Sequence, residues 1–83
     1  MATHYILIEI LAPRTEQPFD RTKWEAFLKV AEELTKEDKV TGQIGSNAWL
    51  VERDKHFDFL AHIVKMADSA GHKYRIQFLR SDD

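Results

Sequence analysis

Cysteine is absent from this sequence, and its absence excludes several kinds of chemistry. The chain can form no disulfide, no cysteine-based zinc site and no thiolate nucleophile. Long apolar runs are missing as well, because the first apolar-rich stretch, residues 5–11, is short and contains Glu9. It cannot span a membrane, and it lacks the basic start of a signal peptide. We therefore expect a cytoplasmic protein.

A strong charge of either sign is also lacking. The chain has 12 basic and 14 acidic residues, so its net charge of −2 offers no global electrostatic reason to bind nucleic acid. Its hydrophobic and charged fractions, 43% and 31%, are ordinary for a globular protein. These values predict a single domain over residues 1–83 with a modest core.

Two strands are predicted at opposite ends of the chain, over residues 5–11 and 72–80, because apolar side chains alternate in both. One antiparallel register joins apolar residues on one face and sets an acid against a base on the other. On the first face the pairs are Ile6 with Phe78, Ile8 with Ile76 and Ile10 with Tyr74. On the second face they are Tyr5 with Leu79, Leu7 with Gln77 and Glu9 with Arg75. This agreement predicts that the two strands are neighbours.

A helix is predicted from about Asp20 or Thr22 to Lys36. Thr22 and Glu25 match the capping box, in which two side chains satisfy backbone donors at a helix start. Apolar residues at three- and four-residue spacing form the buried stripe. They are Trp24, Phe27, Leu28, Ala31 and Leu34.

A second helix is predicted from a cap at Asp54 to about Ser69. Gly71 suits the left-handed position just past its end. Its buried stripe consists of Phe59, Leu60, Ile63, Val64 and Ala67.

A hairpin is predicted between the helices. Residues 40–44 form its weak edge strand and residues 48–52 its second, more apolar strand, with a turn between them. Alternation allows two orientations of the second strand, in which the core is faced either by Trp49 and Val51 or by Leu50.

The resulting order of strand, helix, strand, strand, helix, strand predicts an α+β protein with the ferredoxin-like fold. That fold has a four-stranded antiparallel sheet with two helices on one face, which leaves the other face open. The open face would carry more large apolar groups than an idle surface needs, and such patches often mark interfaces. The simpler alternative is a scatter of surface hydrophobic residues, or cover by the loop of residues 12–21. The predicted interface consists of Tyr5, Leu7, Glu9, Leu11, Arg75, Gln77 and Leu79.

No catalytic or metal-binding group is predicted. His4, His56, His62 and His72 fall at separate places in the expected fold, whereas a metal site needs convergent ligands. RNA binding through the sheet would need exposed aromatic residues on its central strands. Tyr74 and Phe78 are expected on the helix-covered face instead. We therefore expect a protein without cofactor or bound metal.

Residues 43–46, leading into residues 49–52, resemble the hairpin of the small CRISPR-adaptation endoribonucleases, which also have a ferredoxin-like domain. In that family an aspartate at the end of the first strand is the metal-binding catalytic group. This chain has only Glu9 in that strand, so the resemblance implies an inactive relative.

From the sequence we thus expect a non-enzymatic interaction module, such as an adaptor, a regulator or a phage-type inhibitor. It would bind another protein or itself, as a homodimer, through the open sheet face. The alternative is a nucleic-acid binder or metal-dependent nuclease that uses Glu9 and Arg75.

Overall fold

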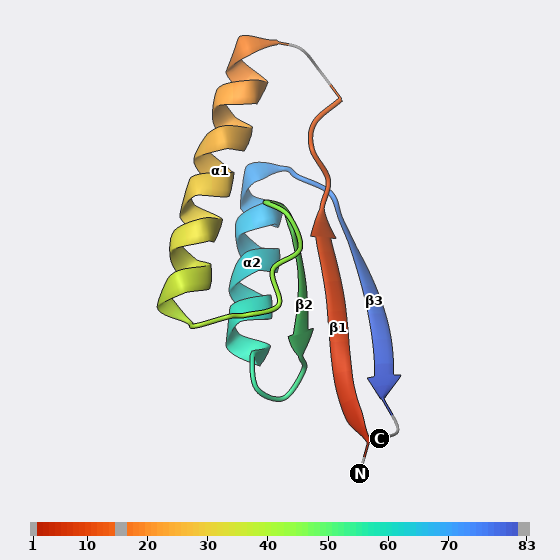
Figure 1. Cartoon of the computed structure of the whole chain (residues 1–83). Coiled ribbons are helices and arrows are strands. Elements are labelled where there is room, and N and C mark those ends of the chain that lie inside the picture. The colour runs from red at the N-terminus through yellow and green to blue at the C-terminus, as the bar shows by residue number, and fades with distance from the viewer. Residues whose placement is uncertain (1, 15–16, 82–83) are drawn as a thin grey trace.

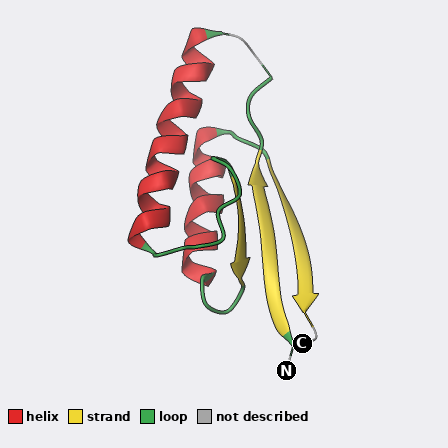
Figure 2. Ribbon diagram, in the orientation of Figure 1, coloured by secondary structure: helices red, strands yellow, loops and turns green. Residues whose placement is uncertain are grey.

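The computed structural model of this chain describes residues 2–14 and 17–81. Three strands and two helices follow one another as β1 (Thr3–Ile10), α1 (Pro18–Glu37), β2 (Ala48–Glu52), α2 (Phe57–Ala70) and β3 (Tyr74–Ser81). The strands form an antiparallel sheet in the order β2-β1-β3. Both helices lie on one side of this sheet (Figure 1), and loops connect the elements (Figure 2). The α+β class is confirmed.

The predicted pairing of the terminal strands is confirmed at every position. Thr3 to Ile10 of β1 pair with Ser81 to Tyr74 of β3, and Ile8 lies opposite Ile76 as predicted. The same register places Glu9 opposite Arg75. Apolar pairing on one face was therefore sufficient to fix which residues of the two strands are neighbours.

The fourth strand of the predicted sheet is wrong. Within residues 40–44 the described structure has a single bridge, between Gln43 and Trp49. Val40 instead packs at the end of α1. Its amide donates a 2.9 Å hydrogen bond to the Thr35 carbonyl, and its side chain is buried. Too few residues remain beside β2 to form a ladder.

The remaining segment nevertheless follows the edge of β2 closely. The amide of Leu50 donates to the Gly42 carbonyl, and the amide of Ile44 donates to the Ala48 carbonyl, each over 2.7 Å. A Cβ atom on Gly42 would lie 1.7 Å from the Leu50 carbonyl oxygen. Only glycine fits at this close approach of two backbones.

α1 begins earlier than the sequence predicts. Its first residue is Pro18, whose fixed φ suits the first turn of a helix. Thr22 therefore lies inside the helix, where its hydroxyl donates a 3.0 Å hydrogen bond to the Pro18 carbonyl. The predicted capping box of Thr22 and Glu25 is wrong for this reason.

α2 begins at Phe57, with His56 at the cap position. The side chain of Asp54 accepts a 3.1 Å hydrogen bond from Nε of Arg53, so the predicted cap at Asp54 is wrong. At the other end Gly71 has φ 78°, which confirms the predicted left-handed residue. No helix of the described residues combines the length and the apolar character needed to cross a bilayer.

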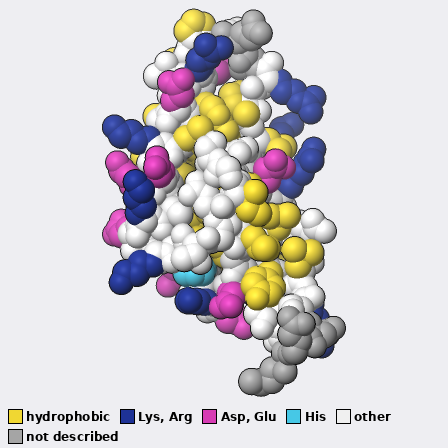
Figure 3. Space-filling model, viewed as in Figure 1, with side chains coloured by type: hydrophobic (Ala, Val, Ile, Leu, Met, Phe, Trp, Pro, Cys, Tyr) yellow, Lys and Arg dark blue, Asp and Glu magenta, His cyan; other side chains and the backbone are white. Residues whose placement is uncertain are grey.

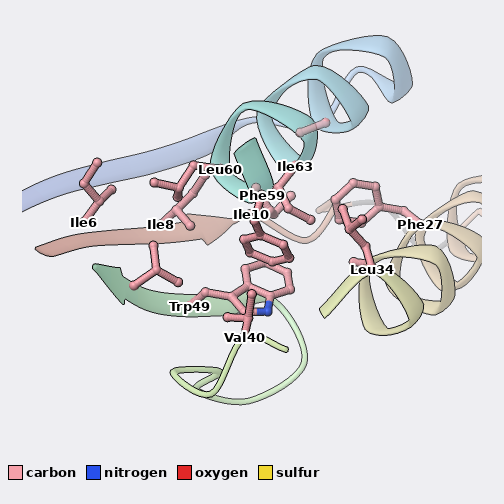
Figure 4. Close-up of a cluster of buried hydrophobic side chains, with 13 residues drawn as sticks. Ile6, Ile8, Ile10, Phe27, Leu34, Val40, Trp49, Phe59, Leu60 and Ile63 are labelled. Carbon is pink, nitrogen blue, oxygen red and sulfur yellow. The ribbon is translucent and has the colours of Figure 1, made fainter. Parts of the chain in front are cut away.

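The core lies between the sheet and the helices. β2 turns Trp49 and Val51 into it and leaves Leu50 half-buried on the opposite face. The indole of Trp49 lies edge-on to the ring of Phe59, with 5.8 Å between centroids (Figure 4). Its Nε1 donates a 3.1 Å hydrogen bond to the Thr35 hydroxyl, so the buried N–H is satisfied.

Candidate functional site

The helix side of the sheet is covered unevenly. On β1, Ile6 and Ile8 are buried, with exposed fractions of 7% and 0%. Their direct partners on β3, Phe78 and Ile76, lie on the same face but are 75% and 41% exposed. The prediction that the helices cover this face of β3 is therefore wrong for Ile76 and Phe78, whereas Tyr74 is half-buried and packs against the core.

An apolar groove runs along this uncovered side, between α2 and β3. It has a volume of about 550 Å³. Figure 3 shows the opposite, open face of the sheet, where further hydrophobic side chains gather over β1 and β3. Phe57, at the start of α2, lines the groove and is 63% exposed. We call this feature the α2–β3 groove, and its apolar lining includes Ile6, Phe57, Leu60, Val64, Ile76 and Phe78.

β3 is also an edge strand, because β1 lies on one side of it and no strand of the described residues lies on the other. The amide of Leu11 donates a 2.8 Å hydrogen bond to the Lys73 carbonyl. Backbone bonding alternates along an antiparallel pair, so odd-numbered residues of β3 bond to β1. The N–H and C=O groups of Ile76 and Phe78 therefore point away from β1, beside their exposed side chains.

The residues predicted to form an interface on the open face are brought together by the register. Tyr5, Leu7 and Glu9 lie beside Leu79, Gln77 and Arg75, with Leu11 just beyond the end of β1. Of the large apolar groups in this set, Leu79 is exposed and the other three are half-buried. The open face is thus a mixed surface, and its role as an interface stays a prediction.

The histidines lie apart. His4 is opposite Arg80 at one end of the strand pair, while His56 precedes α2 and His62 lines a groove between the two helices. Within the part of the chain that the structure describes, His, Asp and Glu form no group of three or more that could hold a metal ion. This arrangement provides no convergent ligand set in that part of the chain.

His72 packs edge-on against two aromatic rings of α1, which stack on each other. Its ring centroid lies 5.1 Å from those of Trp24 and Phe27, in edge-on geometry. Nε2 is buried, with no hydrogen-bond partner among the described residues. Burial lowers the pKa of His72, and the positive charge of Lys23 lowers it further. The neutral ring is therefore favoured, as expected for a packing residue.

A second apolar groove, of about 750 Å³, lies between α1 and α2. Small side chains such as Ala26 and Ala61 line it, together with exposed Val30. Lys23 and Lys65 contribute cationic groups to its lining. This groove was not anticipated from the sequence, because two separate apolar stripes do not reveal how far apart the helices lie.

In comparisons with known proteins, no family model, curated protein or solved structure matches this chain. The resemblance to the CRISPR-adaptation endoribonucleases therefore stays a prediction.

Proposed function

We propose that this chain is a small, non-enzymatic protein-interaction module whose binding strand is β3. An adaptor, a regulator or an inhibitor would act in this way. The observation that carries the proposal is the coincidence, on one strand, of an unoccupied backbone edge and two exposed apolar side chains, Ile76 and Phe78.

Strand addition is the recognition mode that suits such an edge. An added strand gains affinity from backbone hydrogen bonds and specificity from pockets that receive every second side chain. Here the groups of Ile76 and Phe78 that point away from β1 would supply the backbone bonds. The α2–β3 groove lies on the side where every second side chain of the added strand would project.

The exposed apolar surface of the α2–β3 groove supports the same function. Contiguous exposed apolar surface is uncommon on monomers and often marks an interaction site. Phe57, Ile76 and Phe78 come from two different elements and line one groove. Burial of a large apolar side chain contributes on the order of 1.5–3 kcal/mol, so a partner that covers this groove would gain substantially.

Selection from a displayed library of random peptides tests the proposal with purified protein. We expect selected peptides to carry apolar residues at every second position. Their binding should be lost in Phe78→Asp. It should be kept in Phe19→Asp, because Phe19 is about as exposed as Phe78 but lies in the first turn of α1. Circular dichroism would confirm that both variants are folded. Peptides that bind both variants alike would refute binding at β3.

A further inference from the structure

Resting on the proposed function, we infer that the strand added to β3 belongs to a second copy of this chain. The two β3 strands pair antiparallel about a twofold axis through Gln77, which joins two sheets into one. In this arrangement the outward-pointing N–H and C=O groups of one β3 meet the C=O and N–H groups of the other.

The backbone chemistry favours such a pair. Each β3 presents the N–H and C=O of Ile76 and Phe78 on its outer edge. With the axis at Gln77, Ile76 of one copy lies opposite Phe78 of the other. These positions form hydrogen-bonded pairs in which each residue donates its N–H and accepts through its C=O. Gln77 faces its own counterpart in a non-hydrogen-bonded pair.

The side chains favour this axis over those at Phe78 and Arg75, and strand length favours it over the axis at Ile76, which would keep only residues 74–78 in the pair. At Gln77 the exposed side chains of Ile76 and Phe78 meet across the strands, twice by symmetry, with Cβ atoms about 4.5–5.5 Å apart. An axis at Phe78 would instead set Ile76 against Arg80. An axis at Arg75 would set two like charges directly opposite each other, which is destabilising. The axis at Gln77 also keeps residues 74–80, nearly the whole strand, in the pair.

The grooves of the two copies meet in the same arrangement. A twofold axis perpendicular to the sheet keeps both pairs of helices on one side of the joined sheet. The two α2–β3 grooves then face each other across the paired strands. Phe57, which is largely exposed, contributes to an apolar strip shared by both copies.

Charge does not oppose the pairing. Because Arg75 lies opposite Leu79 of the second copy, the two Arg75 side chains are separated by the strand between positions 75 and 79, about 13 Å. That separation exceeds the Debye length of about 8 Å at physiological salt. Within each copy, Arg75 also lies opposite the carboxylate-bearing Glu9.

The two edges of the sheet differ in backbone cover, and the difference points to β3 as the edge available to a second copy. The edge at β2 is followed by residues 42–44, through hydrogen bonds to Leu50 and Ala48. β3 carries neither proline nor lysine, the residues that commonly protect an edge from pairing. An eight-residue strand of this kind is suited to pair with a copy of itself.

Light scattering on a size-exclusion column, over a range of concentrations, tests the inference. We expect the natural chain to form a dimer. In Phe78→Asp the dimer should weaken at least about 100-fold, since the change removes a central apolar anchor and counts twice across the axis. Phe19→Asp and Leu7→Asp should remain dimeric, because neither residue lies at the β3 edge.

Disulfide trapping is a second test that does not depend on a destabilising charge. The chain lacks cysteine, so Gln77→Cys introduces a single thiol. With the axis at Gln77 the two introduced thiols lie opposite each other, about 4.5 Å between Cα atoms, which suits a disulfide. We expect rapid oxidation to a covalent dimer. Arg75→Cys is the matched control, on the same strand and face, and should not cross-link.

The outcomes are separable from those of the peptide selection. A chain that is monomeric at every concentration, and does not cross-link through Gln77→Cys, overturns the second copy. Peptide binding that depends on Phe78 would then still support the proposed function, with a different partner. A dimer that survives Phe78→Asp but is broken by Leu7→Asp overturns pairing at β3 and assigns self-association to the open face.

Discussion

β1 and β3 are neighbours of equal length that pair residue for residue, yet one is buried and the other is not. Ile8 of β1 is inaccessible to solvent, whereas Ile76, directly opposite it on the same face, is 41% exposed. Adjacent strands lie only about 4.8 Å apart. The alternation of apolar residues is the same in the two strands. The difference in burial is therefore decided by how far the helices extend sideways across the sheet.

The largest expected effect comes from replacing this matched pair of isoleucines. Ile8→Ala would leave a cavity in a closed core and should lower the free energy of unfolding by about 2–5 kcal/mol. In the monomer, at low protein concentration, Ile76→Ala removes the same atoms from a partly exposed site and should cost less than about 1 kcal/mol. Urea denaturation measures both. Equal losses would show that β3 is covered in solution to the same extent as β1.

The two edges of the sheet offer the next comparison. Gly42→Ala places a Cβ against the Leu50 carbonyl and should disrupt the hydrogen bond between these residues, at a cost of about 2–3 kcal/mol. Gly45→Ala is the control: it has φ 72° but no atom near the added methyl group, so about 1 kcal/mol is expected. Thermal or urea unfolding would show the difference. Similar losses for both variants would argue against the close contact at β2.

The covered region can be probed through two threonines of α1. Both donate to the carbonyl four residues earlier, but Thr35 also accepts the Trp49 indole N–H. Thr35→Val would leave that buried N–H unsatisfied and should destabilise the fold by about 1–2 kcal/mol. Exposed Thr22→Val should change stability by less than about 0.5 kcal/mol. An unaffected Thr35→Val variant would mean that Trp49 finds another acceptor.

The smallest effect concerns the dependence of stability on pH. The pKa of His72 lies below its ordinary value of about 6.5 in the folded chain, because burial and the positive charge of Lys23 disfavour the charged ring. As pH falls below about 6.5, the unfolded chain therefore binds more protons than the folded one, and stability decreases until the folded pKa is passed. Urea unfolding at pH 7.5 and 5.5 should show this decrease. It should diminish in His72→Gln, whereas His62→Gln, which leaves His72 in place, should retain it.

Much of the fold was accessible from the sequence because it follows from local periodicity. The pairing of Ile6, Ile8 and Ile10 with residues of β3 needed only the period of two and an apolar match. Gly71 was recognised because few other residues tolerate its left-handed backbone. Helix starts were less accessible, since Thr22 and Asp54 satisfy a capping pattern without occupying a cap.

The candidate site was less accessible, for a geometric reason. Alternation correctly assigned Ile76 and Phe78 to the helix side, but it carries no information on how far the helices extend across the sheet. Phe57 lay outside the predicted stripe of α2 and so was not considered. The prediction of a fourth strand was wrong because the Val40 amide donates a hydrogen bond to the Thr35 carbonyl at the end of α1. An alternating apolar pattern carries no information on this contact.

Amide hydrogen exchange along β3, measured at low and high protein concentration, tests the central claim most directly. At low concentration the amides of Arg75 and Gln77, which bond to β1, should exchange slowly, and those of Ile76 and Phe78 should exchange fast. At high concentration we predict that Ile76 and Phe78 become protected, because their N–H groups then bond to a second copy. Fast exchange of these two amides at every concentration would contradict the account.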